Sequence, residues 1–126
     1  VADLLKQNNL TMCTAESCTG GMIAARMVNV PGVSDVFMEG MVTYSNEAKM
    51  RLLGVREDTL KAWGAVSEET AREMAEGGVK ASGTDLCLRG KTCVRRYQFR
   101  GNREKVREQA MMKSLDLARL CILGKS

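Results

Sequence analysis

Residues 10–28, LTMCTAESCTGGMIAARMV, contain the turn that decides the fold. Residues 10–15 are typical of a strand, and residues 22–28 carry apolar side chains at helical spacing. The turn between them places the Ser17 hydroxyl at the open end of a sheet, where the first N–H groups of the helix face any bound group. The stretch therefore predicts a strand, a tight turn and a helix, with Ser17 at their junction.

Helical and strand patterns alternate on both sides of this turn. The expected helices end near residue 8, span 47–53 and 57–63, and begin at Ser67 and at Asn102; the expected strands span 36–44, 85–88 and 92–99. Alternation of this kind predicts an α/β layered domain. We expect a three-layer α/β/α sandwich with a mixed central sheet, formed by a single domain over residues 1–126.

The composition agrees with one domain. The 126 residues suit a single core, and a hydrophobic content of 44% is enough to fill it. No apolar run is long enough to span a bilayer and no secretory leader is visible, so we expect a cytoplasmic protein without a membrane partner. The five cysteines form no CxxC pair and the chain has no histidine, which favours buried, reduced cysteines over a metal site. We expect no cofactor.

Positive charge is concentrated in the C-terminal third. Residues 89–113 hold nine of the Lys and Arg residues and two Glu, within a net charge of +4 for the chain. Such a stretch can attract phosphate or nucleic acid. Aromatic residues do not interleave with the charges as they do in single-strand binders. A solvated strand and helix face is therefore the favoured interpretation, and no nucleic-acid partner is expected.

The absence of histidine restricts the chemistry open to Ser17. A serine hydroxyl needs a base to take its proton, and a desolvated lysine can fill that role. The segment VTYSNEAK, residues 42–49, leaves a predicted strand and enters a predicted helix, so Tyr44 and Lys49 can reach the same sheet edge as Ser17. The alternative interpretation is a solvated surface lysine and a tyrosine that packs at the end of the strand.

Five segments of the chain are informative together. They are TAESCTGG (14–21), GMVTYSNEAK (40–49), LGV (53–55), GAVSEE (64–69) and FRGNRE (99–104). In this order they resemble the C-terminal domain family of the competence/damage-inducible protein CinA, whose enzymatic members are nicotinamide-nucleotide amidases. The resemblance implies hydrolysis of the carboxamide of nicotinamide mononucleotide to nicotinic acid mononucleotide and ammonia, in a homodimer.

The resemblance also implies a role for individual residues. Ser17 is expected to be the nucleophile, Lys49 its general base, and Tyr44 a group that assists proton transfer or orients the lysine. The substrate-binding residues are expected to be Cys18, Thr19, Gly20 and Gly21, whose backbone N–H groups can serve an oxyanion, and Arg103, which can meet the 5′-phosphate. We expect Cys18 to pack inward, Glu16 to orient the turn, Thr19 to cap the helix and Ser67 to cap its own.

One departure from the family pattern bears on the pocket. Leu88 is followed directly by Arg89-Gly90-Lys91-Thr92, where the family continues through a glycine-rich loop and a further strand. Either the sequence omits a segment of the protein between Leu88 and Arg89, or the protein lacks the loop and has an open pocket. The first is favoured, because loss of a central strand would expose core surface. The second makes a non-catalytic nucleotide-binding or regulatory domain the alternative function, with a nucleic-acid accessory role as a third.

Overall fold

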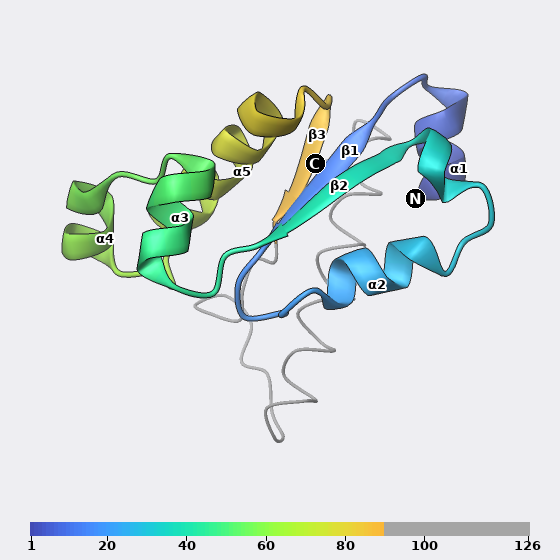
Figure 1. Ribbon diagram of the computed structural model, residues 1–126. Coiled ribbons are helices and arrows are strands. Elements are labelled where there is room, and N and C mark those ends of the chain that lie inside the picture. The colour runs from blue at the N-terminus through green and yellow to red at the C-terminus, as the bar shows by residue number, and fades with distance from the viewer. Residues whose placement is uncertain (90–126) are drawn as a thin grey trace.

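The computed structural model describes residues 1–89 as an α/β unit. Its elements, in chain order, are α1 (Ala2–Gln7), β1 (Met12–Glu16), α2 (Met22–Val28), the 3-10 helix η1 (Val33–Asp35), β2 (Phe37–Val42), α3 (Asn46–Leu53), α4 (Glu57–Trp63), α5 (Glu68–Ser82) and β3 (Leu86–Arg89). The three strands lie in the order β2-β1-β3, with β1 in the centre (Figure 1). No helix of this part of the chain has the length and apolar character needed to cross a membrane.

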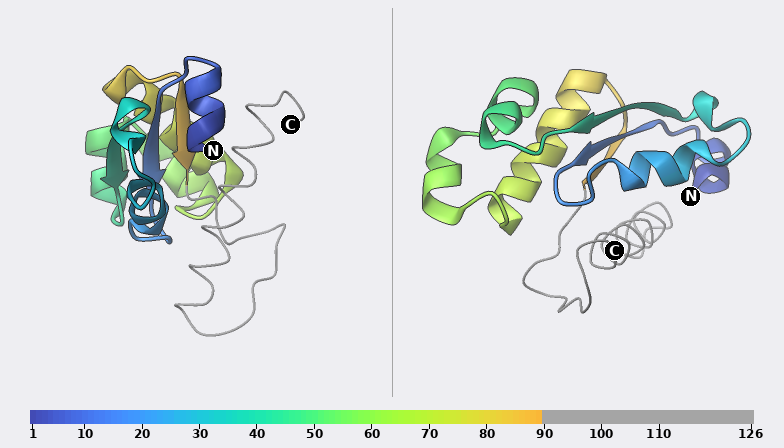
Figure 2. Two further views of the ribbon diagram at one scale, coloured as in Figure 1. Left: turned by 90° about the vertical axis from the view of Figure 1, so that its right-hand side faces the viewer. Right: turned by 60° about the horizontal axis from the view of Figure 1, so that its bottom comes forward.

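Helices cover both faces of the sheet, as Figures 1 and 2 show. On one face, α1 and α2 pack on β1 through a cluster that includes Leu5, Met12, Ile23 and Met27. On the other, α3, α4 and α5 enclose a second cluster that includes Ala15, Leu53, Leu60 and Met74. Met12 and Ala15 belong to different clusters because successive side chains of a strand point to opposite faces. The three layers predicted from the sequence are therefore present.

The prediction of a mixed sheet is wrong for the described strands. Both strand pairs are parallel, with Met12 opposite Phe37 in β2 and Leu86 in β3. The chain leaves each strand through at least one helix before it forms the next strand, and such crossovers return it in the same direction. The strand predicted at 92–99 and the helix after Asn102 lie outside the described residues.

The helix boundaries predicted within residues 1–89 are confirmed, and the caps explain those of α3 and α5. The Ser45 hydroxyl accepts a hydrogen bond from the Ala48 N–H at 3.0 Å, and the Ser67 hydroxyl accepts one from the Thr70 N–H at 3.1 Å. Gly54 ends α3 with φ +66°, a left-handed conformation that glycine adopts without strain. The capped α3 is the element that carries Lys49.

Candidate functional site

The ends of the three parallel strands meet at one edge of the sheet. Ser17 follows β1, Thr43 and Tyr44 follow β2, and Arg89 is the last residue of β3. Ala15 lies opposite both Met41 and Arg89 in the register, so the three strand ends are level with one another. In open α/β sheets, the carboxyl ends of the strands are where ligands bind. The structure thus brings Ser17 and the segment that carries Tyr44 and Lys49 to the same edge.

The Ser17 turn is held by a buried carboxylate. The Glu16 side chain, at the end of β1, is fully buried. Its two oxygens accept hydrogen bonds from the N–H groups of Gly21 (3.1 Å), Ile23 (2.9 Å) and Ala24 (3.0 Å). These are N–H groups that the first turn of a helix leaves without partners, and a negative charge there is favourable. The expectation that Glu16 orients the turn is confirmed.

Two of the four backbone N–H groups expected to serve an oxyanion are occupied within this turn. The Gly20 N–H donates to the Ser17 carbonyl at 3.0 Å, and the Gly21 N–H donates to Glu16. The Thr19 N–H has no hydrogen bond within residues 1–89. The two glycines instead supply left-handed backbone, with φ values of +60° and +98°. Their role in the turn is conformational.

The capping role predicted for Thr19 is wrong. Gly21 is the N-terminal flanking residue of α2, and Glu16 supplies the side-chain acceptor. The Thr19 hydroxyl is buried and has no hydrogen-bond partner in the described part of the chain. Cys18 is partly buried rather than packed fully inward.

Lys49 is a buried lysine. Its side chain is 1% exposed, and Nζ donates hydrogen bonds to the carbonyl oxygens of Thr43 at 2.8 Å and Tyr44 at 3.4 Å. The Thr43 N–H in turn donates to the Glu16 carbonyl at 2.8 Å, which ties this lysine pocket to the end of β1. The surface-lysine alternative is therefore excluded.

Burial also changes the acid–base behaviour of Lys49. Desolvation of the ammonium group lowers the pKa of Lys49 below its ordinary value of 10.5, and the charge of an ionised Cys18 partly opposes this shift. The Cys18 effect requires the lysine charge to lie close to the turn that holds Ser17 and Cys18. Lys49 thus has the direction of pKa shift that a lysine base needs.

Tyr44 lies at this edge with its side chain 65% exposed. Its contact with Lys49 is made by the backbone carbonyl oxygen. An effect of Tyr44 on the orientation of the lysine therefore has a structural basis in its backbone, whereas a role for the phenol stays a prediction. Arg103, the expected phosphate contact, lies outside the described residues.

Arg89 is a basic residue at this edge that the sequence analysis did not assign to the site. It is partly buried, and burial lowers the pKa of its guanidinium, while Glu68 raises it and Arg72 lowers it. Arg89 therefore lies near the first turns of α5, on the α5 side of the sheet. Its position at the end of a strand was the signal available in the sequence.

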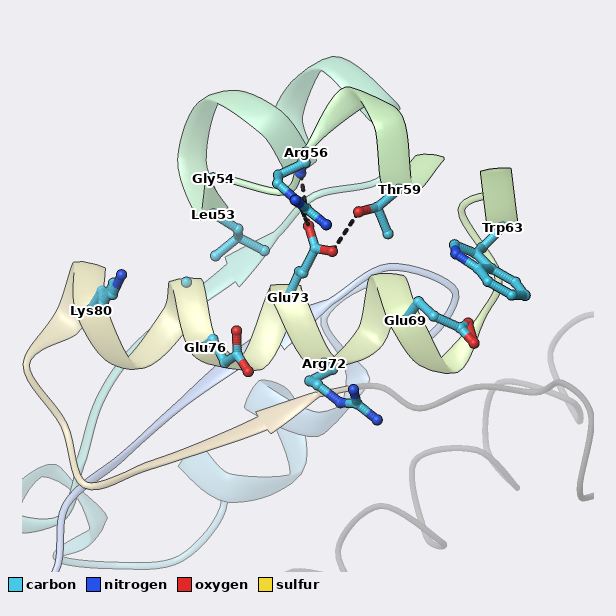
Figure 3. Close-up of a pocket in the computed structure, with 11 residues that line it drawn as sticks. Leu53, Gly54, Arg56, Thr59, Trp63, Glu69, Arg72, Glu73, Glu76 and Lys80 are labelled. Atoms are coloured by element: carbon cyan, nitrogen blue, oxygen red, sulfur yellow. Dashed lines mark hydrogen bonds and ion pairs between the residues drawn. The ribbon is translucent and has the colours of Figure 1, made fainter. Parts of the chain in front are cut away.

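A separate cavity of about 480 Å³ lies on the outer side of α5 (Figure 3). In it, the Glu73 carboxylate accepts hydrogen bonds from the Arg56 N–H and the Thr59 hydroxyl. Trp63 lines one end and Lys80 the other. Neither Ser17 nor Lys49 belongs to its lining, so this cavity is distinct from the sheet-edge site.

Comparison with known sequences identifies relatives of the whole chain. The family model described as the CinA C-terminal domain matches residues 1–89. A CinA-like protein of Kosmotoga olearia is 46% identical over 149 aligned positions, which cover 98% of this chain and 36% of that protein. A putative competence-damage inducible protein of Clostridium perfringens is also 46% identical, over 94% of this chain and 35% of its own length. The chain thus spans about a third of the length of these relatives.

The relatives also contain residues that this chain lacks. A putative competence-damage inducible protein of Alkaliphilus oremlandii is 41% identical over 152 aligned positions that cover all of this chain. Because the chain has 126 residues, some of those positions have no counterpart in it.

Comparison with solved structures finds proteins of the same family. A crystal structure of a CinA superfamily protein from Klebsiella pneumoniae has a TM-score of 0.91 at 27% identity, over 98% of this chain and 93% of that chain. A competence or damage-inducible protein from Enterobacter asburiae has a TM-score of 0.88 at 28% identity, over 96% of this chain and 92% of that chain. By sequence and by structure, the chain belongs to the CinA C-terminal domain family.

Proposed function

We propose that the sheet-edge site hydrolyses the carboxamide of nicotinamide mononucleotide, with Ser17 as nucleophile and Lys49 as base. The observation that carries this proposal is the buried Lys49 amine, which has a lowered pKa and lies beside the Ser17 turn in a chain without histidine. A structural lysine on a helix surface would need neither the burial nor the two carbonyl contacts. The substrate class comes from the family resemblance.

The hydrogen bonds of Lys49 suit a general base. A neutral lysine amine has two N–H bonds and one lone pair. The two N–H bonds can remain on the Thr43 and Tyr44 carbonyls, which leaves the lone pair for the proton of the Ser17 hydroxyl. The Ser17 oxygen then attacks the carboxamide carbon, and the Thr19 N–H can donate to the oxyanion that forms.

The same lysine serves the later steps. The protonated Lys49 gives its proton to the departing ammonia as the tetrahedral intermediate collapses to an ester on Ser17. It then takes a proton from the water that hydrolyses this ester, which regenerates Ser17 and releases nicotinic acid mononucleotide. Each proton taken by Lys49 is returned, so one amine performs the whole cycle.

Arg89 is our candidate for recognition of the substrate phosphate within the described residues. It is a cation at the edge of the sheet that holds Ser17, and its partial burial makes pairing with an anion more favourable than at a fully exposed position. We propose this contact in addition to the one expected of Arg103. A cytoplasmic homodimer acting on a small nucleotide is the corresponding biological unit.

The alternative is a domain that binds the nucleotide without turnover. The observation in its favour is that some aligned positions of the relatives have no counterpart in this chain. If these positions form a pocket loop, its loss removes contacts to the substrate. Incubation with nicotinamide mononucleotide, followed by chromatography and mass analysis of the nucleotide, separates the two functions. Conversion to nicotinic acid mononucleotide supports the amidase. A rise in melting temperature with unchanged nucleotide supports the binding domain and contradicts the amidase.

A further inference from the structure

Two cysteines outside the proposed active site lie side by side in neighbouring strands. Cys13 of β1 and Cys87 of β3 are direct partners in the parallel register. Adjacent strands are roughly 4.8 Å apart. This spacing lies within the range of about 4.4 to 6.8 Å for the Cα atoms of disulfide-bonded cysteines. The backbone therefore already has the separation that a covalent bond between these residues requires.

Both sulfur atoms point to the same side of the sheet, beneath α5. A Cβ atom built on Gly78 would lie 2.4 Å from the Cys87 Sγ and 3.4 Å from the Cys13 Sγ. A larger residue at this position would force the Cys87 sulfur to shift, so Gly78 lets the helix lie directly against the two sulfurs. The two thiols thus share one small space between β1, β3 and α5.

This space favours a thiolate on one of the two sulfurs. The pKa of Cys13 is lowered to about 6, chiefly by the neighbouring Cys87 S–H group and to a smaller extent by the nearby Ser82 and Thr84 side chains. Burial and the Glu39 carboxylate oppose this shift. The pKa of Cys87 is raised, because it is the partner that keeps the proton. Cys13 is buried and Cys87 is only partly buried, so Cys87 is the member of the pair that lies nearer to solvent.

We propose that Cys13 and Cys87 form a redox pair, which reduces a peroxide and closes to an intramolecular disulfide. The Cys13 thiolate attacks one peroxide oxygen and becomes a sulfenic acid, and the hydroxide that leaves takes the proton of Cys87. The Cys87 thiolate then attacks the Cys13 sulfur and displaces the second oxygen as hydroxide, which becomes water with the proton that Cys13 gave up when it ionised. Two thiols and one hydrogen peroxide give one disulfide and two water molecules. The two electrons pass from the sulfurs to the peroxide.

The experiment uses the full chain, hydrogen peroxide and thiol-specific mass mapping. After oxidation, remaining thiols are blocked with iodoacetamide, and the protein is digested with trypsin and Glu-C. Cleavage after Glu16 separates Cys13 from Cys18, which trypsin alone leaves in one peptide. We expect a linked pair of peptides, 7–16 and 81–89, that is lost on treatment with dithiothreitol.

Two variants make the assignment specific. The Cys18→Ser protein removes a neighbouring thiol and should form the same linked peptides at the same rate. The Cys87→Ala protein should form none, because the resolving thiol is absent. The proposal is overturned if Cys13 and Cys87 of the folded wild-type protein both remain alkylatable. It is equally overturned if Cys13 links to Cys18, Cys93 or Cys121, or if the 13–87 link forms only after unfolding in urea.

Discussion

At the scale of single residues, the proposed chemistry depends on a lysine that has been taken out of water. Lys49 is 1% exposed, and its amine contacts two carbonyl oxygens at the end of β2. An ammonium in this position is less well solvated than one in water, which is why its pKa falls. The sequence could indicate a lysine near the start of a helix. It could not indicate burial, because burial results from how α3 packs on the rest of the domain.

The depressed pKa of Lys49 predicts the pH dependence of the reaction. The value of kcat/KM for ammonia release should rise with pH and level off at a pH below the ordinary lysine pKa of 10.5, because only the neutral amine can accept the Ser17 proton. Lys49→Arg, which keeps the charge and does not deprotonate, should lower kcat by at least about 100-fold. Lys61→Arg is the matched control, since Lys61 is an exposed lysine paired with Glu57. A flat pH profile with an active Lys49→Arg protein would exclude Lys49 as the base.

The same shift links stability to pH with a defined sign. Between the depressed pKa and 10.5, the unfolded chain holds the Lys49 proton and the folded chain does not. The free energy of unfolding should therefore rise with pH across this window, relative to that of a Lys49→Met protein. Urea denaturation of both proteins at several pH values measures this difference. A difference in the free energy of unfolding that stays constant or falls with pH contradicts the lowered pKa of Lys49.

Arg89 makes a prediction about substrate recognition. Arg89→Gln should raise KM for nicotinamide mononucleotide by roughly 10- to 100-fold with little change in kcat, because a charge-assisted contact to the phosphate is lost. A nicotinamide riboside, which has no phosphate, should be hydrolysed equally by both proteins. Arg56→Gln, in the separate outer cavity, is the control. An equal rise in KM for both substrates would show that Arg89 does not bind the phosphate.

At the scale of elements, the connection between β1 and α2 is the part that holds Ser17 in place. The buried Glu16 carboxylate accepts hydrogen bonds from three backbone N–H groups, which belong to the turn and to the first residues of α2. Glu16→Gln keeps the shape of the side chain and replaces one acceptor oxygen with a donor. We expect a loss of about 1 to 3 kcal/mol in the free energy of unfolding. Urea denaturation measures the change.

The control for this element is an exposed glutamate. Glu47 has a side chain that is 83% exposed and pairs with Arg51 four residues later. Glu47→Gln should change the free energy of unfolding by no more than about 0.5 kcal/mol. If Glu16→Gln is as mild as the control, the carboxylate does not hold the turn and Ser17 is positioned by other contacts.

Much of the element order was predictable because the signals are local. Ser45 and Ser67 begin their helices as side-chain caps, and Gly54 and Gly64 follow the ends of α3 and α4. Strand direction is not local, and the prediction of a mixed sheet is wrong for the three described strands for this reason. Thr19 was assigned to a cap because a hydroxyl near a helix start suits that role. The acceptor that takes the position, Glu16, comes from the preceding strand.

At the scale of the whole molecule, the region after β3 determines how complete the site is. The family model ends at residue 89, and β3 is an edge strand among the described strands. We propose that the positions of the relatives without a counterpart belong between Leu88 and Arg89, as the sequence pattern indicates. The phosphate contact of Arg89 is proposed for the chain in which Arg89 follows Leu88 directly and ends β3, because an insertion at this junction moves Arg89 away from that position. Ser17, Lys49 and the buried Glu16 all lie before this junction, so the proposal assigns the additional residues to the wall of the substrate pocket.

A chimera tests this proposal. The corresponding loop and strand of the Kosmotoga olearia relative, inserted between Leu88 and Arg89, should raise both kcat/KM and the free energy of unfolding, because a neighbouring strand covers the edge of β3. The same segment inserted after Gly64, between α4 and α5, is the control and should improve neither. An insertion after Leu88 that lowers both quantities would place the missing residues elsewhere.

The rate of ammonia release from nicotinamide mononucleotide, compared between Ser17→Ala and Cys18→Ala, tests the proposed mechanism most directly. The two substitutions lie side by side in one turn, and each removes one possible nucleophile. With Ser17 as the nucleophile, Ser17→Ala should lose about a thousandfold or more in kcat, while Cys18→Ala stays close to the wild-type rate. The proposed mechanism would be contradicted if the Ser17→Ala protein keeps its rate of ammonia release and the Cys18→Ala protein loses it.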